Sequence, residues 1–402
     1  MKRKTLSRLI SLVFLLLFLG FLAVSGAVTF FKEKEETSFY ENRALAAFPE
    51  RSRAGMLDGS WFAALNAYVQ DQTAGRDTIL RKDTFLNLRL LHRPVVNEIV
   101  VRGDTLLPWM DYWTADPEGI RTQAEAMADT LAGHARQTEA FGGRFYYAVV
   151  PGQYAYFADR YPAWLNSNAD HNALAVPALL SALADRWVAG IDLGERFEAM
   201  GHPPELFSRI DHHYTIYGAY ETYRAILERI NTDTGWGLDI LEEGDYTIRP
   251  LPNPYLGSRS RKLFGLWKTD ESLGLLEQTS PVPFTRTDLA PWSPNPMEND
   301  NLDALPATET EEVTYNVYMG GDMAMTEIRT DRPELPSILI YGDSFTNPVE
   351  GMLYASFDTL WSLDLRHYDA MTLDQFIAEK QPDVVVCLRD YDSMLKAEGN
   401  GL

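Results

Sequence analysis

Hydrophobic positions divide this chain into an apolar amino-terminal stretch and a long body with mixed patterns. Apolar residues recur at helical spacing over 56–94 and 117–140, whereas 145–150 and 383–388 are continuous apolar runs, typical of strands buried on both faces. Strand-like and helix-like stretches alternate along most of the body, which predicts an α/β fold with a parallel sheet flanked by helices. We also expect a hairpin over 95–109, strands over 188–193 and 337–341, and helices over 173–187, 217–230, 349–357 and 373–380.

The stretch from 235 to 335 interrupts this alternation. It is rich in Pro, Gly and acidic residues, and it predicts short strands and loops rather than helices. We therefore expect residues 32–110 to form a tether, helices and a hairpin. Residues 111–402 should form the α/β domain, with 235–335 as a loop-rich β insertion.

The amino-terminal stretch predicts attachment to a membrane. Residues 9–31 contain no charge, and about 20 apolar residues are enough to span a bilayer as a helix. Four basic residues and no acidic residue precede it, so residues 1–8 should form a cytoplasmic tail and the bulk of the chain should lie outside. The small residues Ser25, Gly26 and Ala27 leave a cleaved signal peptide open, but the length favours an uncleaved anchor. The basic residues are Lys2, Arg3, Lys4 and Arg8.

Composition narrows the possible functions. The 402 residues include 36 Lys and Arg against 57 Asp and Glu, a formal net charge of −21, which argues against a nucleic-acid partner. The single cysteine, Cys387, excludes an intrachain disulfide framework and any metal site built on a Cys-x-x-Cys motif.

The first candidate for chemistry is Gly342-Asp343-Ser344, which directly follows the strand predicted over 337–341. The carboxyl ends of parallel strands are where α/β folds place their sites, and a glycine permits a tight turn there. A following helix would aim backbone N–H groups at an oxyanion. The alternative is a turn without catalytic function, since Gly-Asp-Ser is a common turn composition.

The second candidate is Asp211-His212-His213-Tyr214. A serine hydroxyl needs a base to become a nucleophile, and the base needs a carboxylate to orient it. Asp211 and His213 are two residues apart, so they point to the same side of an extended segment. A capped helix start, a histidine pair on an exposed loop, or a metal site using Asp211, His212 and His213 are the alternatives.

Together the two motifs resemble the DHHW protein family, which is similar to the alginate O-acetyltransferase branch of the SGNH hydrolases. In that branch an Asp-x-His element precedes the Gly-Asp-Ser element, the reverse of ordinary SGNH enzymes, and this chain has the reversed order. The aromatic Tyr214 replaces the Trp of the family motif. Shorter matches extend the resemblance to about residues 38–395: Glu41-Asn42-Arg43, Phe48-Pro49, Arg76-Asp77, Val101-Arg102-Gly103-Asp104, Val150-Pro151, Leu256-Gly257-Ser258 and Met319-Gly320-Gly321-Asp322.

The resemblance implies roles for individual residues. Ser344 would be the nucleophile, His213 the base and Asp211 the residue that orients it. The backbone N–H of Ser344 would be the first oxyanion donor, with Gly321 or the amide of Asn347 as further donors. Gly321 has a simple turn as its alternative. No metal or cofactor is implied.

We therefore expect an extracytoplasmic enzyme that transfers an acyl group, most simply acetyl, to a cell-surface polysaccharide or other glycan, or releases it to water. A membrane-embedded protein is the candidate acyl donor. The alternative is a non-catalytic protein of the SGNH fold that binds glycans or acts as a scaffold in cell-envelope assembly.

Overall fold

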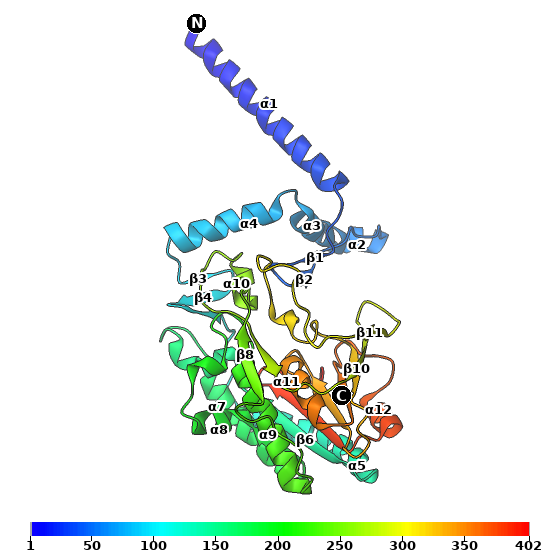
Figure 1. The fold of residues 1–402 in the computed structure, drawn as a ribbon. Helices are drawn as coiled ribbons and strands as arrows, with labels where there is room; N and C mark the ends of the chain where they lie inside the picture. Colours follow the sequence, from blue (N-terminus) through cyan, green and yellow to red (C-terminus); the bar gives the residue numbers. More distant parts are fainter. Residues whose placement is uncertain (1, 402) are drawn as a thin grey trace. The chain divides into compact units, whose positions relative to one another are not determined.

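A computed structural model describes residues 2–401, with side chains from Ser7 onward (Figure 1). Within the tail predicted over residues 1–8, Met1 and the side chains of residues 2–6 lie outside this description. The chain forms two compact units. One comprises Met1–Glu98 with Ser260–Lys268, and the other comprises Ile99–Arg259 with Thr269–Leu402.

The smaller unit begins with α1, Lys2–Phe31. Its portion Ser7–Phe31 is long and apolar enough to cross a membrane, and the same properties also fit a signal sequence. The helical spacing predicted over 56–94 corresponds to a series of short helices. The elements after α1 are β1 (Thr37–Ser38), β2 (Arg43–Ala44), α2 (Arg53–Asp58), α3 (Ser60–Gln72), α4 (Arg76–Phe85), the π-helical turn η1 (Leu86–Leu90) and β3 (Val95–Val96).

Local sequence explains where these helices start and stop. The Ser52 hydroxyl accepts a hydrogen bond from the Gly55 N–H at 3.2 Å and so caps the start of α2. Gly59 then adopts a left-handed φ of 86°, which is accessible to glycine at little cost, and separates α2 from α3. A second left-handed glycine, Gly75, precedes α4.

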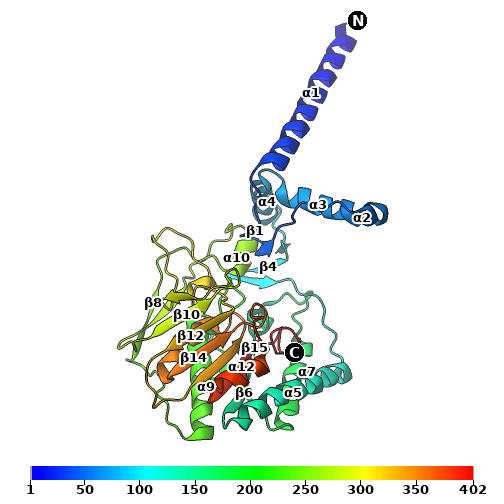
Figure 2. The same ribbon diagram turned by 90° about the vertical axis from the view of Figure 1, so that its right-hand side faces the viewer.

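The larger unit is built on an eight-stranded sheet with the order β11-β10-β12-β14-β13-β15-β6-β7. The five strands from β14 to β7 are parallel, whereas β12, β10 and β11 extend the sheet in antiparallel pairings. Figure 2 shows β10, β12, β14 and β15 of this sheet. The strands are β6 (Arg144–Val150), β7 (Ala189–Asp192), β10 (Thr285–Leu289), β11 (Met297–Asn299), β12 (Met325–Arg329), β13 (Ile338–Gly342), β14 (Thr359–Leu363) and β15 (Val384–Asp390).

Helices cover both faces of this sheet, which explains the continuous apolar runs in the central strands. Alternate residues of β6, β13 and β15 pack into one core with α5, α7 and α12. The other face packs on α8, α9 and α11. The main helices are α5 (Pro117–Ala140), α7 (Ala169–Ala184), α8 (Leu193–Ala199), α9 (Ile216–Thr234), α11 (Asn347–Leu353) and α12 (Leu373–Lys380).

Smaller elements complete the unit. The predicted hairpin consists of β4 (Ile99–Arg102) and β5 (Thr105–Pro108). A second antiparallel pair, β8 (Tyr246–Pro250) and β9 (Gly274–Gln278), lies in the predicted insertion. The short helical segments are α6 (Gln153–Tyr156), η2 (Ala158–Arg160), η3 (Pro204–Leu206), α10 (Ser258–Lys262), η4 (Tyr315–Val317) and η5 (Tyr354–Ser356).

The structure confirms the predicted α/β class and adds one feature. The strands β10, β11 and β12 of the predicted insertion join the central sheet, which is therefore mixed rather than wholly parallel. The connection depends on β14, which the hydrophobic pattern did not reveal and which pairs with β12 on one side and β13 on the other.

Candidate active site

Ser344 lies in a tight turn at the carboxyl end of β13. A Cβ atom on Gly342 would lie 2.3 Å from the carbonyl oxygen of Leu388 on β15, so this position requires glycine for close strand packing. The Thr346 N–H then donates to the Asp343 carbonyl at 2.8 Å, and α11 begins at Asn347. This geometry leaves Ser344 half-buried at the strand end, where the sequence placed it.

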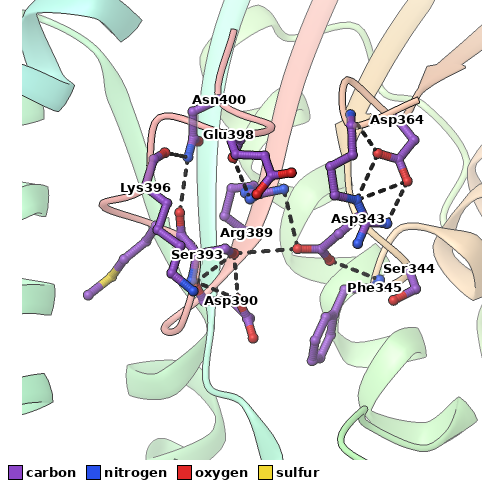
Figure 3. Close-up of polar contacts among 12 residues, drawn as sticks. Asp343, Ser344, Phe345, Asp364, Arg389, Asp390, Ser393, Lys396, Glu398 and Asn400 are labelled. Atoms are coloured by element: carbon purple, nitrogen blue, oxygen red, sulfur yellow. Dashed lines mark hydrogen bonds and ion pairs between the residues drawn. The ribbon is translucent and has the colours of Figure 1, made fainter. Parts of the chain in front are cut away.

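The Asp343 side chain attaches this turn to the end of β15 (Figure 3). Its Oδ2 atom lies 3.3 Å from Arg389 Nη1 and accepts a hydrogen bond from the Ser393 hydroxyl at 3.4 Å. Its Oδ1 atom accepts from the Phe345 N–H at 3.1 Å. Burial, together with the nearby acids Asp392 and Asp343, raises the pKa of Asp390, which lies in the same cluster. The buried Arg389 offsets part of this negative charge.

The segment that carries the second motif, residues 208–214, folds back on itself just before α9. The Ser208 N–H donates to the His213 carbonyl at 3.2 Å, and Phe207 and Tyr214 form an isolated β-bridge. The buried Tyr214 hydroxyl donates to the Phe345 carbonyl. The tyrosine that replaces the family's tryptophan therefore links the histidine segment directly to the serine turn.

Asp211, His213 and Ser344 form one continuous hydrogen-bonded chain. The Asp211 Oδ1 and His213 Nδ1 atoms are 2.6 Å apart, and the His213 Nε2 and Ser344 Oγ atoms are also 2.6 Å apart. Asp211 is 2% exposed and His213 is 3% exposed, so only the serine end of the chain is open to a substrate. The structure thus brings together the three residues that the two motifs predicted.

Asp211 is held from both of its carboxylate oxygens. Its Oδ1 atom also accepts from the His213 N–H at 3.1 Å, and its Oδ2 atom accepts from the Ser258 N–H at 2.6 Å. Burial alone would raise the pKa of Asp211, but the charge and hydrogen bond of His213 outweigh this effect and lower the pKa well below its usual range. Asp211 is therefore ionised at neutral pH and favours a proton on His213 Nδ1.

The Gly257-Ser258 segment supports the histidine segment, a role that the sequence did not reveal. A Cβ atom on Gly257 would lie 2.5 Å from the Ile210 carbonyl oxygen and 3.0 Å from the Asp211 Cβ, so only glycine fits. The Ser258 hydroxyl lies 2.8 Å from His212 Nδ1 and accepts from the His212 N–H at 3.2 Å. The family resemblance marked these two residues as a motif, which was the available signal for their importance.

Aromatic rings fix the plane of the His213 imidazole. The Tyr315 ring is stacked on it, with centroids 3.7 Å apart and planes 10° apart, and the Phe345 ring meets it edge-on at 4.9 Å. Tyr315 belongs to η4 in the loop-rich insertion, where no local pattern distinguishes it from other tyrosines. The site thus includes a residue that sequence reasoning missed.

The two predicted accessory oxyanion donors lie in bonded turns. The single N–H of Gly321 donates to the Tyr318 carbonyl at 3.0 Å, so this glycine has no spare backbone donor in this conformation. The Asn347 amide donates to Asp322 Oδ1 at 3.1 Å and, as an NH2 group, retains a second hydrogen. Among the described residues, no acceptor is found for the backbone N–H of Ser344.

The alternative metal site has a geometric basis in the same residues. Potential ligand atoms of Asp211, His212 and His213 lie within 4.8 Å of one another. However, both ring nitrogens of His213 already have partners, Asp211 and Ser344. A metal ion bound through His213 would have to replace one of these two contacts.

Comparison with known proteins supports the fold. No curated protein matches this chain, but residues 110–294 match the family described as the SGNH hydrolase-like domain of the acetyltransferase AlgX. PatB1 of Bacillus cereus is 22% identical with a TM-score of 0.63, over 75% of this chain and 98% of that protein. PatB1 with a sulfonyl adduct gives 19% identity and a TM-score of 0.61, over 75% and 97%.

A DHHW family protein from Eubacterium siraeum is 17% identical with a TM-score of 0.53, over 76% of this chain and 95% of that protein. At these identities the three structures establish the fold, while the family match covers nearly half of the chain. The resemblance predicted from the two motifs is confirmed: this chain has an SGNH hydrolase-like fold and is similar to the AlgX acetyltransferase family.

Proposed function

We propose that this protein is an extracytoplasmic, serine-dependent acyltransferase or esterase that acts on a cell-surface glycan through Asp211, His213 and Ser344. The observation that carries this proposal is the pair of 2.6 Å contacts that joins the three side chains into one chain. The fold shared with PatB1 and the match to the AlgX acetyltransferase family favour acetyl as the transferred group.

The first half of the reaction would load Ser344. His213 Nε2 takes the proton from Ser344 Oγ, which attacks the carbonyl carbon of the acyl donor and forms a tetrahedral intermediate. Asp211 stabilises the resulting imidazolium through His213 Nδ1. The intermediate collapses to an acyl-serine when the bond to the donor's oxygen breaks, and this oxygen receives the proton held by His213.

The second half would transfer the acyl group. A glycan hydroxyl gives its proton to His213 Nε2 and attacks the acyl-serine carbonyl, and Ser344 leaves with that proton restored. Water in place of the glycan hydroxyl gives ester hydrolysis by the same steps. The chemistry therefore depends on which acceptor occupies the open side of Ser344.

Both halves need a donor to the oxyanion of the tetrahedral intermediate. The backbone N–H of Ser344 is our first candidate, since no other acceptor is found for it in the described chain. The second hydrogen of the Asn347 amide is the other candidate, and its bond to Asp322 would hold the amide in place. The Gly321 N–H would first have to release the Tyr318 carbonyl.

Placement outside the cell would follow from α1. We propose that α1 stays as an uncleaved anchor with residues 1–8 in the cytoplasm, because basic residues and no acidic residue precede the span. The remainder then reaches its glycan on the outer face of the membrane. A membrane-embedded protein that carries acyl groups across the bilayer would be the donor partner.

The test compares the wild-type protein with Ser344→Ala in two assays, hydrolysis of an acetyl ester and labelling by an aryl sulfonyl fluoride. We expect the variant to lose at least about 1,000-fold in acetyl-ester turnover and to lose the label. The label is chosen because PatB1, which shares this fold, was solved with a sulfonyl adduct. Ser393→Ala is the matched control, because that serine contacts Asp343 but not His213. Unchanged turnover in Ser344→Ala would overturn the mechanism.

A further inference from the structure

The helices from α2 to η1 in the smaller unit expose many large apolar side chains. Leu57 is 91% exposed, Leu90 is 64% exposed and Phe62 is 58% exposed. Single exposed apolar residues are ordinary, but this many in 39 residues of one segment mark a surface with a partner. The remaining exposed members are Met56, Ile79, Phe85, Leu86 and Leu91.

The same segment is basic in a strongly acidic protein. Residues 51–93 contain seven Lys and Arg against four Asp and Glu, although the whole chain has a net charge of −21. Arg53, Arg81, Lys82 and Arg89 are exposed between the apolar side chains. Exposed apolar groups interspersed with cations are typical of helices that lie in the headgroup region of a membrane with anionic lipids.

The segment is also attached to the end of the candidate membrane span. The Ala74 N–H, just after α3, donates to the buried hydroxyl of Thr29 at 3.2 Å, and the rings of Phe30 and Tyr68 are 6.1 Å apart. Both views show α3 and α4 running crosswise to α1 near its carboxyl end (Figures 1 and 2). A span that ends at Phe31 therefore leaves α3 at the boundary between lipid and water.

We infer that residues 53–91 form an interfacial platform that lies on the anionic phospholipid surface of the membrane crossed by α1. This inference rests on the part of the proposed function that makes α1 an uncleaved anchor. The partner is lipid rather than a protein, because the surface is continuous with the span and its charge is complementary to anionic headgroups. The platform fixes the smaller unit against the bilayer at several points instead of leaving it on a flexible stalk.

The experiment uses the full-length protein in vesicles and places one nitroxide label at a time. The only native cysteine, Cys387, is buried, and burial raises the pKa of its thiol to about 12, so it should not react. Labels go on Leu57→Cys, Phe62→Cys and Leu90→Cys. The matched control is Trp187→Cys in the larger unit, a position that is 91% exposed, as Leu57 is. Collisions with oxygen report lipid, and collisions with a nickel chelate report water.

In vesicles that contain phosphatidylglycerol, we expect the ratio of oxygen to nickel collisions at the three platform positions to exceed that at position 187 at least threefold, roughly, as for side chains ~5–10 Å into the interface. In vesicles of phosphatidylcholine alone the ratio should fall toward the control. Arg81→Glu combined with Lys82→Glu should produce the same fall in anionic vesicles.

Water-exposed labels at all three positions in both kinds of vesicle would overturn the platform and leave the surface to a protein partner. An alkaline carbonate wash of the same vesicles separates this failure from failure of the anchor. Protein that is released shows that α1 is not an anchor. Protein that is retained with water-exposed labels contradicts the platform alone and leaves the proposed anchor and chemistry intact.

Discussion

The two compact units of this chain differ in charge and in what their surfaces present. The smaller unit has 17 Lys and Arg against 10 Asp and Glu, whereas the larger unit has 19 against 47. Ten large apolar side chains are exposed among residues 32–98, compared with twelve in the whole larger unit. Asp211, His213 and Ser344 all lie in the larger, acidic unit.

This difference indicates that attachment and chemistry are assigned to different parts of the chain. A surface of −28 repels anionic headgroups, so the larger unit is unsuited to lie on them, while the smaller unit carries a charge of +7. Changes in one unit should therefore affect catalysis and changes in the other should affect lipid contact. The four predictions below test that separation, from the largest expected effect to the smallest.

The strongest test compares two adjacent histidines of the larger unit. We expect His213→Gln to lower turnover of an acetyl ester at least about 10,000-fold, because the base is lost from the chain to Ser344. His212→Gln should cost less than about tenfold, since His212 contacts Ser258 rather than Ser344. Steady-state kinetics of both proteins gives the comparison. Equal losses would show that the pair acts as a unit, as a metal site would require.

A weaker effect is expected where the support of Asp211 is disturbed. Gly257→Ala places a Cβ 2.5 Å from the Ile210 carbonyl oxygen, so the histidine segment must shift, and we expect a loss of about 10-fold to 100-fold in turnover. Gly351→Ala on α11 is the control, because nothing lies within 4 Å of a Cβ there. Lipid contact in the platform assay should remain unchanged in both variants. Full activity in Gly257→Ala would contradict the close fit.

The third prediction concerns pH and the buried Glu350 on α11. Burial raises its pKa from 4.5 to about 7, opposed by hydrogen bonds from Ser362 and Thr346. Between these values the folded protein keeps a proton that the unfolded chain has released, so stability falls as pH rises through this window. Relative to Glu350→Gln, the wild-type protein should lose about 3 kcal/mol of unfolding free energy from pH 4.5 to pH 8, at 1.36 kcal/mol per pKa unit.

Urea unfolding of both proteins at several pH values measures this difference. The Gln variant keeps a carbonyl acceptor for Ser362 and Thr346 but has no proton to release. A constant gap between the two unfolding free energies across the window would contradict the assignment.

The smallest effect is expected in the platform. Leu57→Ser should change the turnover of a soluble acetyl ester by less than about twofold, because Leu57 is a surface residue outside the chemical unit. The same variant should weaken the lipid contact of a label at Leu90→Cys. A large loss of soluble-ester activity would instead show that the two units are coupled.

Much of the larger unit was predictable because its signals are local. The strands β6 and β15 are buried on both faces and therefore appear as unbroken apolar runs. Asp211 and His213 are two residues apart, so their pairing is visible in the sequence itself. The contact between His213 and Ser344 spans 131 residues, and only the family resemblance could suggest it.

Other features depend on contacts that leave no local pattern. Tyr315 stacks on His213 from a loop-rich region, and its neighbours in the sequence give no periodic signal. The short strand β14 joins β12 to β13, so the mixed sheet appears only when distant strands are paired. Gly257 is required by a close approach to Ile210, a distance that no sequence pattern encodes.

The order of the reacting groups along the chain has a consequence for biosynthesis. The acid and base are made 131 residues before the nucleophile, and Arg389, which holds the turn of that nucleophile, is made later still. A nascent or truncated polypeptide that ends before Arg389 therefore lacks a supported Ser344. The ribosome and the export machinery would handle an inert precursor, and reactivity would arise only once the carboxyl-terminal strand had joined the sheet.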